Sequence, residues 1–173
     1  MSYAGTLVVA AKGDHEITMI RRFGAPRAMV FEAWTKPELL KRWMTGPPGM
    51  TLPICEVDLR VGGAYRYVWR TGDGHEMGAG GTFLEVAAPE RFVATERFDQ
   101  AWYPGEAVIT ITFVEQDGET EVTTTMRYES TESRDGVLRS GMTDGVRQSY
   151  DRVAAIFETE LAAQDAAPDR KRA

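Results

Sequence analysis

The stretch that decides the fold runs from Val137 to Leu161 and reads V-L-R-S-G-M-T-D-G-V-R-Q-S-Y-D-R-V-A-A-I-F-E-T-E-L. Its apolar residues recur at three- and four-residue steps, which places them on one face of a helix. They are Met142, Val146, Tyr150, Val153, Phe157 and Leu161. Because the opposite face is acidic and basic, the pattern predicts one long amphipathic helix that covers a second layer.

The two halves of this predicted helix differ in bulk. The C-terminal half places large side chains on the apolar face, whereas Gly141, Gly145 and Ser149 lie close to that face in the N-terminal half. Glycine inside a helix costs about 0.8–1.0 kcal/mol relative to alanine. Two glycines four residues apart therefore indicate that space is left under the N-terminal half, or that another group comes close to it.

The chain from Thr51 to Tyr128 follows a different period. Apolar and polar residues alternate, and Gly, Pro and Asp separate the alternating runs, which is typical of antiparallel strands joined by short turns. The expected strands are Thr51–Leu59, Ala64–Arg70, Met77–Val86, Phe92–Phe98, Ala107–Glu115 and Glu121–Tyr128. One face of each strand is apolar, so we expect a sheet that is covered on one side only.

Three shorter elements precede this region. His15–Phe23 alternates as a strand, and Pro26 and Pro37 each suit the first turn of a short helix. The order β-α-α-β6-α predicts an α+β fold in which a curved antiparallel sheet is wrapped around the long C-terminal helix. We expect a single domain over residues 14–163, a flexible leader or an edge strand within residues 1–13, and a disordered tail over residues 164–173.

Composition excludes several classes of partner. The net charge of −6 argues against nucleic acid, which binds basic surfaces. Cys55 is the only cysteine, so no internal disulfide forms and a reducing, cytoplasmic location is expected. No apolar run is long enough to span a bilayer, so we expect no membrane partner. A homodimer through an exposed sheet edge or helix face stays open.

Metal and nucleophilic chemistry find little support. Cys55, His15 and His75 have no paired spacing, so we expect neither a metal nor another cofactor. The runs Gly72-Asp73-Gly74 and Gly78-Ala79-Gly80-Gly81 do not fit a phosphate-binding motif and are interpreted as turn and bulge glycines.

No catalytic residue is assigned, but general acid–base catalysis stays open. A carboxyl group that faced a cavity would have its pKa raised by desolvation and could act as a base near neutral pH. The candidates for such a role are Tyr65, Tyr67, Glu96, Asp99 and Tyr128.

Aromatic residues predict a pocket between the sheet and the helix. Tyr67 and Trp69 alternate on one strand face, and ligand pockets combine aromatic walls with few polar groups. The expected ligand-binding wall consists of Tyr67, Trp69, Phe83, Ile109, Ile111, Met126, Tyr128, Met142, Val146 and Ser149. Strand phase decides this set, because a slip of one residue turns every strand side chain outward.

Four stretches resemble a known family. They are A-P-R-A-M-V-F-E-A-W-T-K-P-E-L-L-K-R-W from Ala25, C-E-V-D-L-R-V-G-G-A-Y-R-Y-V-W-R from Cys55, G-G-T-F-L-E-V-A-A-P-E-R-F-V-A-T-E-R-F from Gly80, and S-G-M-T-D-G-V-R-Q-S-Y-D-R-V from Ser140. Together they are similar to the START-like (SRPBCC) superfamily, in the branch related to the activator of Hsp90 ATPase. The resemblance runs from about residue 16 to residue 161.

The resemblance implies a helix-grip fold, as in Bet v 1 and START domains, with a hydrophobic cavity between sheet and long helix. It implies a soluble protein that encloses a small hydrophobic or aromatic molecule. Two alternatives are a cyclase- or aromatase-type enzyme that uses a cavity carboxylate or tyrosine, and an Hsp90 co-chaperone-like protein-binding module. Many relatives have tryptophan where this chain has Val146, which implies a roomier or differently shaped pocket.

Overall fold

The computed structural model describes residues 7–100 and 102–167. Eight strands form one sheet in the order β1-β2-β8-β7-β6-β5-β4-β3, and every neighbouring pair is antiparallel. The strands are β1 (Val8–Lys12), β2 (Glu16–Phe23), β3 (Thr51–Val57), β4 (Ala64–Arg70), β5 (Glu76–Ala87), β6 (Arg91–Phe98), β7 (Ala107–Gln116) and β8 (Glu119–Arg127). Seven of them coincide with the predicted runs to within a few residues.

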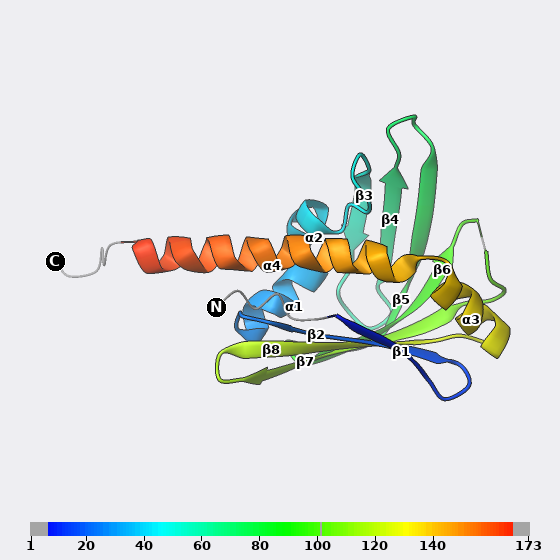
Figure 1. Ribbon diagram of the computed structural model, residues 1–173, viewed down its shortest axis with the longest axis horizontal. Coiled ribbons are helices and arrows are strands. Elements are labelled where there is room, and N and C mark those ends of the chain that lie inside the picture. Colours follow the sequence, from blue (N-terminus) through cyan, green and yellow to red (C-terminus); the bar gives the residue numbers. More distant parts are fainter. Residues whose placement is uncertain (1–6, 101, 168–173) are drawn as a thin grey trace.

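The helices gather on one side of this sheet. They are α1 (Arg27–Thr35), α2 (Pro37–Trp43), α3 (Thr131–Arg139) and α4 (Met142–Ala166). Figure 1 shows the sheet curving strongly, with β1, β2, β7 and β8 running beneath α4 and β3–β5 standing upright across it. This is the predicted α+β helix-grip arrangement. Within the residues described, no helix combines the length and the apolarity needed to cross a membrane.

The middle of α4, from Tyr150 to Phe157, is anchored on an aromatic cluster. Tyr150 and Phe157 have ring centroids 5.7 and 5.8 Å from that of Phe23 on β2, in edge-to-face geometry. The ring of Trp34 on α1 lies 5.4 Å from Phe23 and 5.5 Å from Tyr150. Such pairs contribute about 0.5–1.5 kcal/mol beyond the burial of their surface. Val153 is also buried, so this middle segment is held against β2 and α1.

The helix predicted from Val137 to Leu161 is in fact two helices, and this part of the prediction is wrong. Gly141 adopts φ +80°, a left-handed conformation that ends a helix and that glycine adopts most readily. The first helix, α3, begins earlier, where the Ser130 hydroxyl accepts a hydrogen bond from the backbone N–H of Ser133. Of the two glycines, only Gly145 therefore lies inside a helix.

The structure bears on both predicted chain ends. Of the two alternatives for residues 1–13, the edge strand is found over Val8–Lys12, which forms β1 with Val8 opposite Ile20 of β2 and Leu7 buried beside it. At the other end α4 continues to Ala166, because Ala and Gln propagate a helix well. Residues 1–6 and 168–173 of the predicted leader and tail lie outside the described residues.

The break at Gly141 can be tested with two alanine substitutions. No described heavy atom lies within 4 Å of a Cβ placed at Gly141 or at Gly136 of α3, so the two sites differ mainly in backbone conformation. Gly141→Ala should lower the free energy of unfolding by about 1–2 kcal/mol, because L-residues are disfavoured in the left-handed region. Gly136→Ala should raise it by about 0.5–1 kcal/mol. Urea unfolding measures both, and equal effects would contradict the break.

Candidate functional site

A pocket of about 370 Å³ lies between the N-terminal half of α4 and the sheet. Its volume falls in the range of small-molecule sites. Strands β2 and β4 to β8 supply one wall, and α1, α2 and α4 supply the other. The lining residues are Met19, Trp34, Leu40, Trp43, Met44, Gly46, Tyr65, Tyr67, Trp69, Phe83, Phe92, Ala94, Glu96, Ile109, Ile111, Thr124, Met126, Met142, Gly145, Val146, Ser149 and Tyr150.

Most of the wall residues expected from the sequence lie on this surface. They are Tyr67, Trp69, Phe83, Ile109, Ile111, Met126, Met142, Val146 and Ser149. Tyr128 does not line the pocket: it follows the end of β8, its ring packs 5.2 Å from that of Tyr103, and its hydroxyl lies 3.6 Å from the Met126 sulfur. Contact between any of these residues and a ligand stays a prediction.

Sequence reasoning missed the contribution of the two short helices. The rings of Trp34 and Trp43 have centroids 4.6 Å apart and are tilted by 44°, and both line the pocket together with Leu40 and Met44. The Trp43 indole N–H donates to the Ala33 carbonyl at 2.9 Å. The Trp69 indole N–H donates to the Met44 carbonyl at 2.8 Å, which joins β4 to the end of α2. The apolar faces of α1 and α2 were visible in the sequence, but their position over the sheet was not.

The first turns of α4 leave space over the sheet, whereas its middle segment packs on the aromatic cluster. Met142 and Val146 are only partly buried, and both line the pocket. A Cβ placed at Gly145 would meet no heavy atom of the described chain within 4 Å. The glycine therefore keeps one position of the wall free of side chain.

Glu96 places a carboxyl group on the pocket wall. It alternates on β6 with Phe92 and Ala94, which also line the pocket. Its side chain makes no hydrogen bond or ion pair with any residue that the structure describes. Desolvation raises the pKa of Glu96 to about 7. The carboxyl group therefore changes its charge near neutral pH.

The other acid–base candidates are placed differently. Asp99 lies outside the pocket, and Arg66 donates to its carboxylate at 2.6 Å and holds its pKa below the ordinary value. Tyr65 and Tyr67 line the pocket, and the Tyr65 hydroxyl donates to the Thr95 carbonyl at 2.6 Å. Burial first, and the charge of Glu96 in addition, raise the pKa values of Tyr65 and Tyr67 above the ordinary range. These phenols stay protonated near neutral pH and are therefore not available as phenolate bases.

The geometry favours neither nucleophilic catalysis by the cysteine nor metal binding by the described residues. Burial raises the pKa of the Cys55 thiol to about 11, so the thiol is protonated and unreactive at neutral pH. Within the described ranges, no three His, Cys, Asp or Glu residues come together as a metal site would require.

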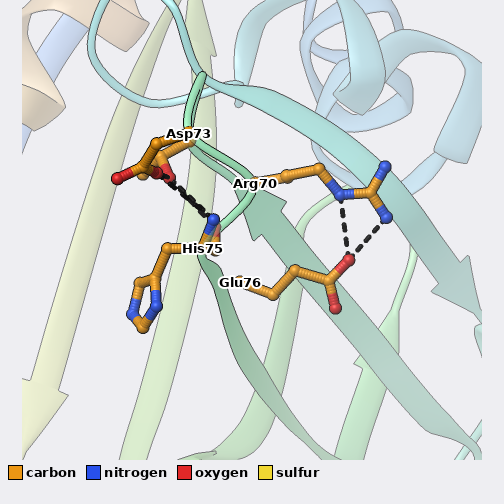
Figure 2. A network of polar contacts seen from close by, with 5 residues as sticks. Arg70, Asp73, His75 and Glu76 are labelled. Atoms are coloured by element: carbon orange, nitrogen blue, oxygen red, sulfur yellow. Dashed lines mark hydrogen bonds and ion pairs between the residues drawn. The ribbon is translucent and has the colours of Figure 1, made fainter.

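The run Gly72-Asp73-Gly74 is the turn of the β4–β5 hairpin. Figure 2 shows Arg70 paired with Glu76 across the two strands, at 2.9 Å from Nε to Oε1, and the Asp73 carboxylate accepting from the His75 backbone N–H. The His75 imidazole points away from that carboxylate. Gly74 has φ +89°, as a tight turn requires. The turn interpretation of this run is therefore confirmed.

Solved structures similar to this chain share its fold over most of its length. A protein from Rhodobacter sphaeroides is 25% identical, with a TM-score of 0.83 over 91% of this chain and 98% of its own. A protein from Chromobacterium violaceum is 29% identical, with a TM-score of 0.70 over 83% and 97%. An Hsp90 activator from Plasmodium falciparum is 20% identical, with a TM-score of 0.54 over 76% and 89%, a likeness of fold alone.

Comparison with family models gives the assignment, whereas no curated protein matches the chain. The model described as "Activator of Hsp90 ATPase homolog 1-like protein" matches residues 24–158. The match spans α1 to α4 and includes all the pocket-lining residues except Met19. The chain therefore belongs to the family of proteins like the activator of Hsp90 ATPase homolog 1, in the START-like superfamily.

Proposed function

We propose that the protein is a soluble, cytoplasmic binding protein that encloses a small hydrophobic or aromatic molecule between α4 and the sheet. The observation that carries this proposal is the pocket of about 370 Å³ with largely aromatic and aliphatic walls. Apolar space inside a protein costs stability, about 24 cal/mol per Å³ where it is created by substitution. A ligand that fills the pocket would recover dispersion contacts and remove apolar surface from water.

A second candidate function is catalysis, and Glu96 is the observation that favours it. A carboxyl group with a pKa of about 7 in an apolar pocket is suited to take a proton from a bound substrate. Cyclases and aromatases need such a base. Turnover of a polyketide-like substrate that rises through about pH 7 and disappears in Glu96→Gln would support this candidate. No turnover across a panel of such substrates would remove it.

The Hsp90 activator is similar to this chain in fold alone, so the alternative of an Hsp90 partner rests on family membership. An ATPase assay with Hsp90 tests it directly. Stimulation of ATP hydrolysis would support the co-chaperone alternative, and an unchanged rate would remove it.

Filling the pocket from α4 tests the binding proposal. Native mass spectrometry and thermal-shift screens against lipids, polyketides and flavonoids should identify an apolar ligand whose binding has a negative heat-capacity change. Gly145→Leu should then weaken its affinity by about tenfold or more, which is about 1.4 kcal/mol or more, because the new side chain occupies ligand space.

The matched control is Gly136→Leu, at a helical glycine of α3 that also has open space around it but lies outside the pocket. It should leave affinity unchanged. Equal effects of the two substitutions on binding, or no apolar ligand in any screen, would count against the proposal.

The ionisation of Glu96 should be visible in stability before any ligand is known. Its folded pKa of about 7 lies above the ordinary 4.5, so the charged form is disfavoured in the folded state. The stability that the neutral carboxyl contributes is complete below pH 4.5 and is lost as pH rises through 7. Glu96→Gln should therefore match wild type at low pH and exceed its free energy of unfolding by up to about 3 kcal/mol above pH 8.

Urea unfolding of both proteins across this pH range measures the difference. Glu106→Gln, at an exposed acid outside the pocket, is the control and should show no such divergence. Parallel stability curves for wild type and Glu96→Gln would mean that Glu96 is not desolvated.

A further inference from the structure

The pocket carries one charge, and it is negative. Of the described residues that line it, Glu96 is the only Asp, Glu, Lys, Arg or His. The rest of the lining is apolar, apart from hydroxyl groups such as those of Thr124 and Ser149. Glu96 is partly buried, and a carboxylate removed from water is normally paired, because an isolated ion loses its hydration without compensation. The absence of a partner within the described chain points to a partner that comes from outside it.

Basic side chains on the elements around the pocket are engaged elsewhere or face solvent. Arg21 of β2 is 2% exposed, and its Nη1 lies 2.7 Å from Oδ1 of Asp151 on α4, outside the pocket lining. On β4, Arg66 pairs with Asp99. Arg42 of α2 pairs with Glu160 of α4, and Arg147 pairs with Asp144 within α4. Lys41 and Arg97 are exposed.

The groups that do act on Glu96 cannot neutralise it. In β7 the residue opposite Glu96 is Ala107, and the neighbouring part of β5 contains Gly80 and Gly81. The titratable groups whose pKa values Glu96 raises are the phenols of Tyr65, Tyr67, Tyr103 and Tyr128. A phenol can donate a hydrogen bond to a carboxylate but brings no positive charge.

Aromatic rings form much of the remaining wall. Eight lining residues are aromatic: Trp34, Trp43, Tyr65, Tyr67, Trp69, Phe83, Phe92 and Tyr150. The face of an aromatic ring attracts a cation, by about 0.5–1 kcal/mol at exposed sites and about 2 kcal/mol or more when the pair is desolvated. Aromatic walls around a single carboxylate therefore favour a positively charged guest over a neutral or negative one.

We infer that the pocket selects hydrophobic amines: molecules with an apolar or aromatic body and one protonated nitrogen, for which Glu96 is the counter-ion. This inference rests on the proposed binding function and narrows it to one chemical class. A ligand with a carboxylate, such as a fatty acid, would bring a second negative charge into a pocket whose described lining has no cation. Two like charges in a desolvated site repel strongly.

Three probes with one apolar body test the inference. Phenylbutylamine, phenylbutanol and phenylbutanoic acid differ only in the terminal group, and titration calorimetry gives their affinities. At about pH 8, where Glu96 is ionised, the amine should bind about tenfold or more tightly than the alcohol, and the acid should bind most weakly. Equal or tighter binding of the alcohol or the acid would overturn the inference and leave the binding function standing.

The pH dependence supplies a second readout that needs no variant. An alkylamine stays protonated well above neutral pH, whereas Glu96 gains a proton as pH falls below about 7. The preference for amine over alcohol should therefore decline by up to about tenfold per pH unit below 7. A preference that is the same at about pH 5.5 and about pH 8 would contradict the role of Glu96.

Glu96→Gln should abolish both the preference and its pH dependence, because glutamine keeps the shape and removes the charge. Glu106→Gln, with its exposed acid outside the pocket, should behave as wild type. A preference for amine that survives Glu96→Gln would overturn the inference. The binding function itself would be overturned by a different result: none of the three probes binds wild type, and Gly145→Leu changes the affinity of no ligand from the screens.

Discussion

The packing of the middle of α4 onto an aromatic cluster is the interaction on which the rest of the structure depends. Phe23, Trp34, Tyr150 and Phe157 hold this segment against β2 and α1. Unfilled volume under a helix draws the helix inward, since empty space forfeits dispersion contacts. Because the middle of α4 is fixed by this packing, its first turns can cross a pocket without collapsing into it. The pocket wall and the anchoring contacts thus come largely from different turns of the same helix.

Within the pocket, the wall residues and the one charged residue also differ in how they are held. Trp43 and Trp69 are held in place by hydrogen bonds from their indole N–H groups to backbone carbonyls, so the walls are preorganised. Glu96 has no such partner among the described residues, and its charged form is disfavoured. Polar groups that are desolvated and left unpaired cost stability. Natural proteins accept such costs chiefly at functional sites, which is why the proposed choice of ligand is argued from this residue more than from any wall residue.

Much of the fold could be predicted, because a pattern that repeats every two residues in a strand, or every 3.6 in a helix, shows directly which side chains share a face. Ile109 and Ile111 faced the pocket as their alternation required, and Val146 did so from helical spacing. The helix break at Gly141 was missed because the spacing of apolar residues does not detect a single left-handed residue. The apolar residues on either side of the break still fall on one helical face. Tyr128 is the expected wall residue that does not line the pocket, because it follows the end of β8, where its ring packs on Tyr103. Glu96 could be named only as one of several candidates, since its burial depends on how the sheet curves.

The distribution of the four tryptophans has a spectroscopic consequence. Trp34, Trp43 and Trp69 lie on the pocket wall, whereas Trp102, between β6 and β7, is 48% exposed. An aqueous quencher such as iodide reaches the indole of Trp102 most readily, because Trp34 and Trp43 are buried and Trp69 is partly buried. The emission that resists quenching thus reports mainly on the pocket wall, without any label attached.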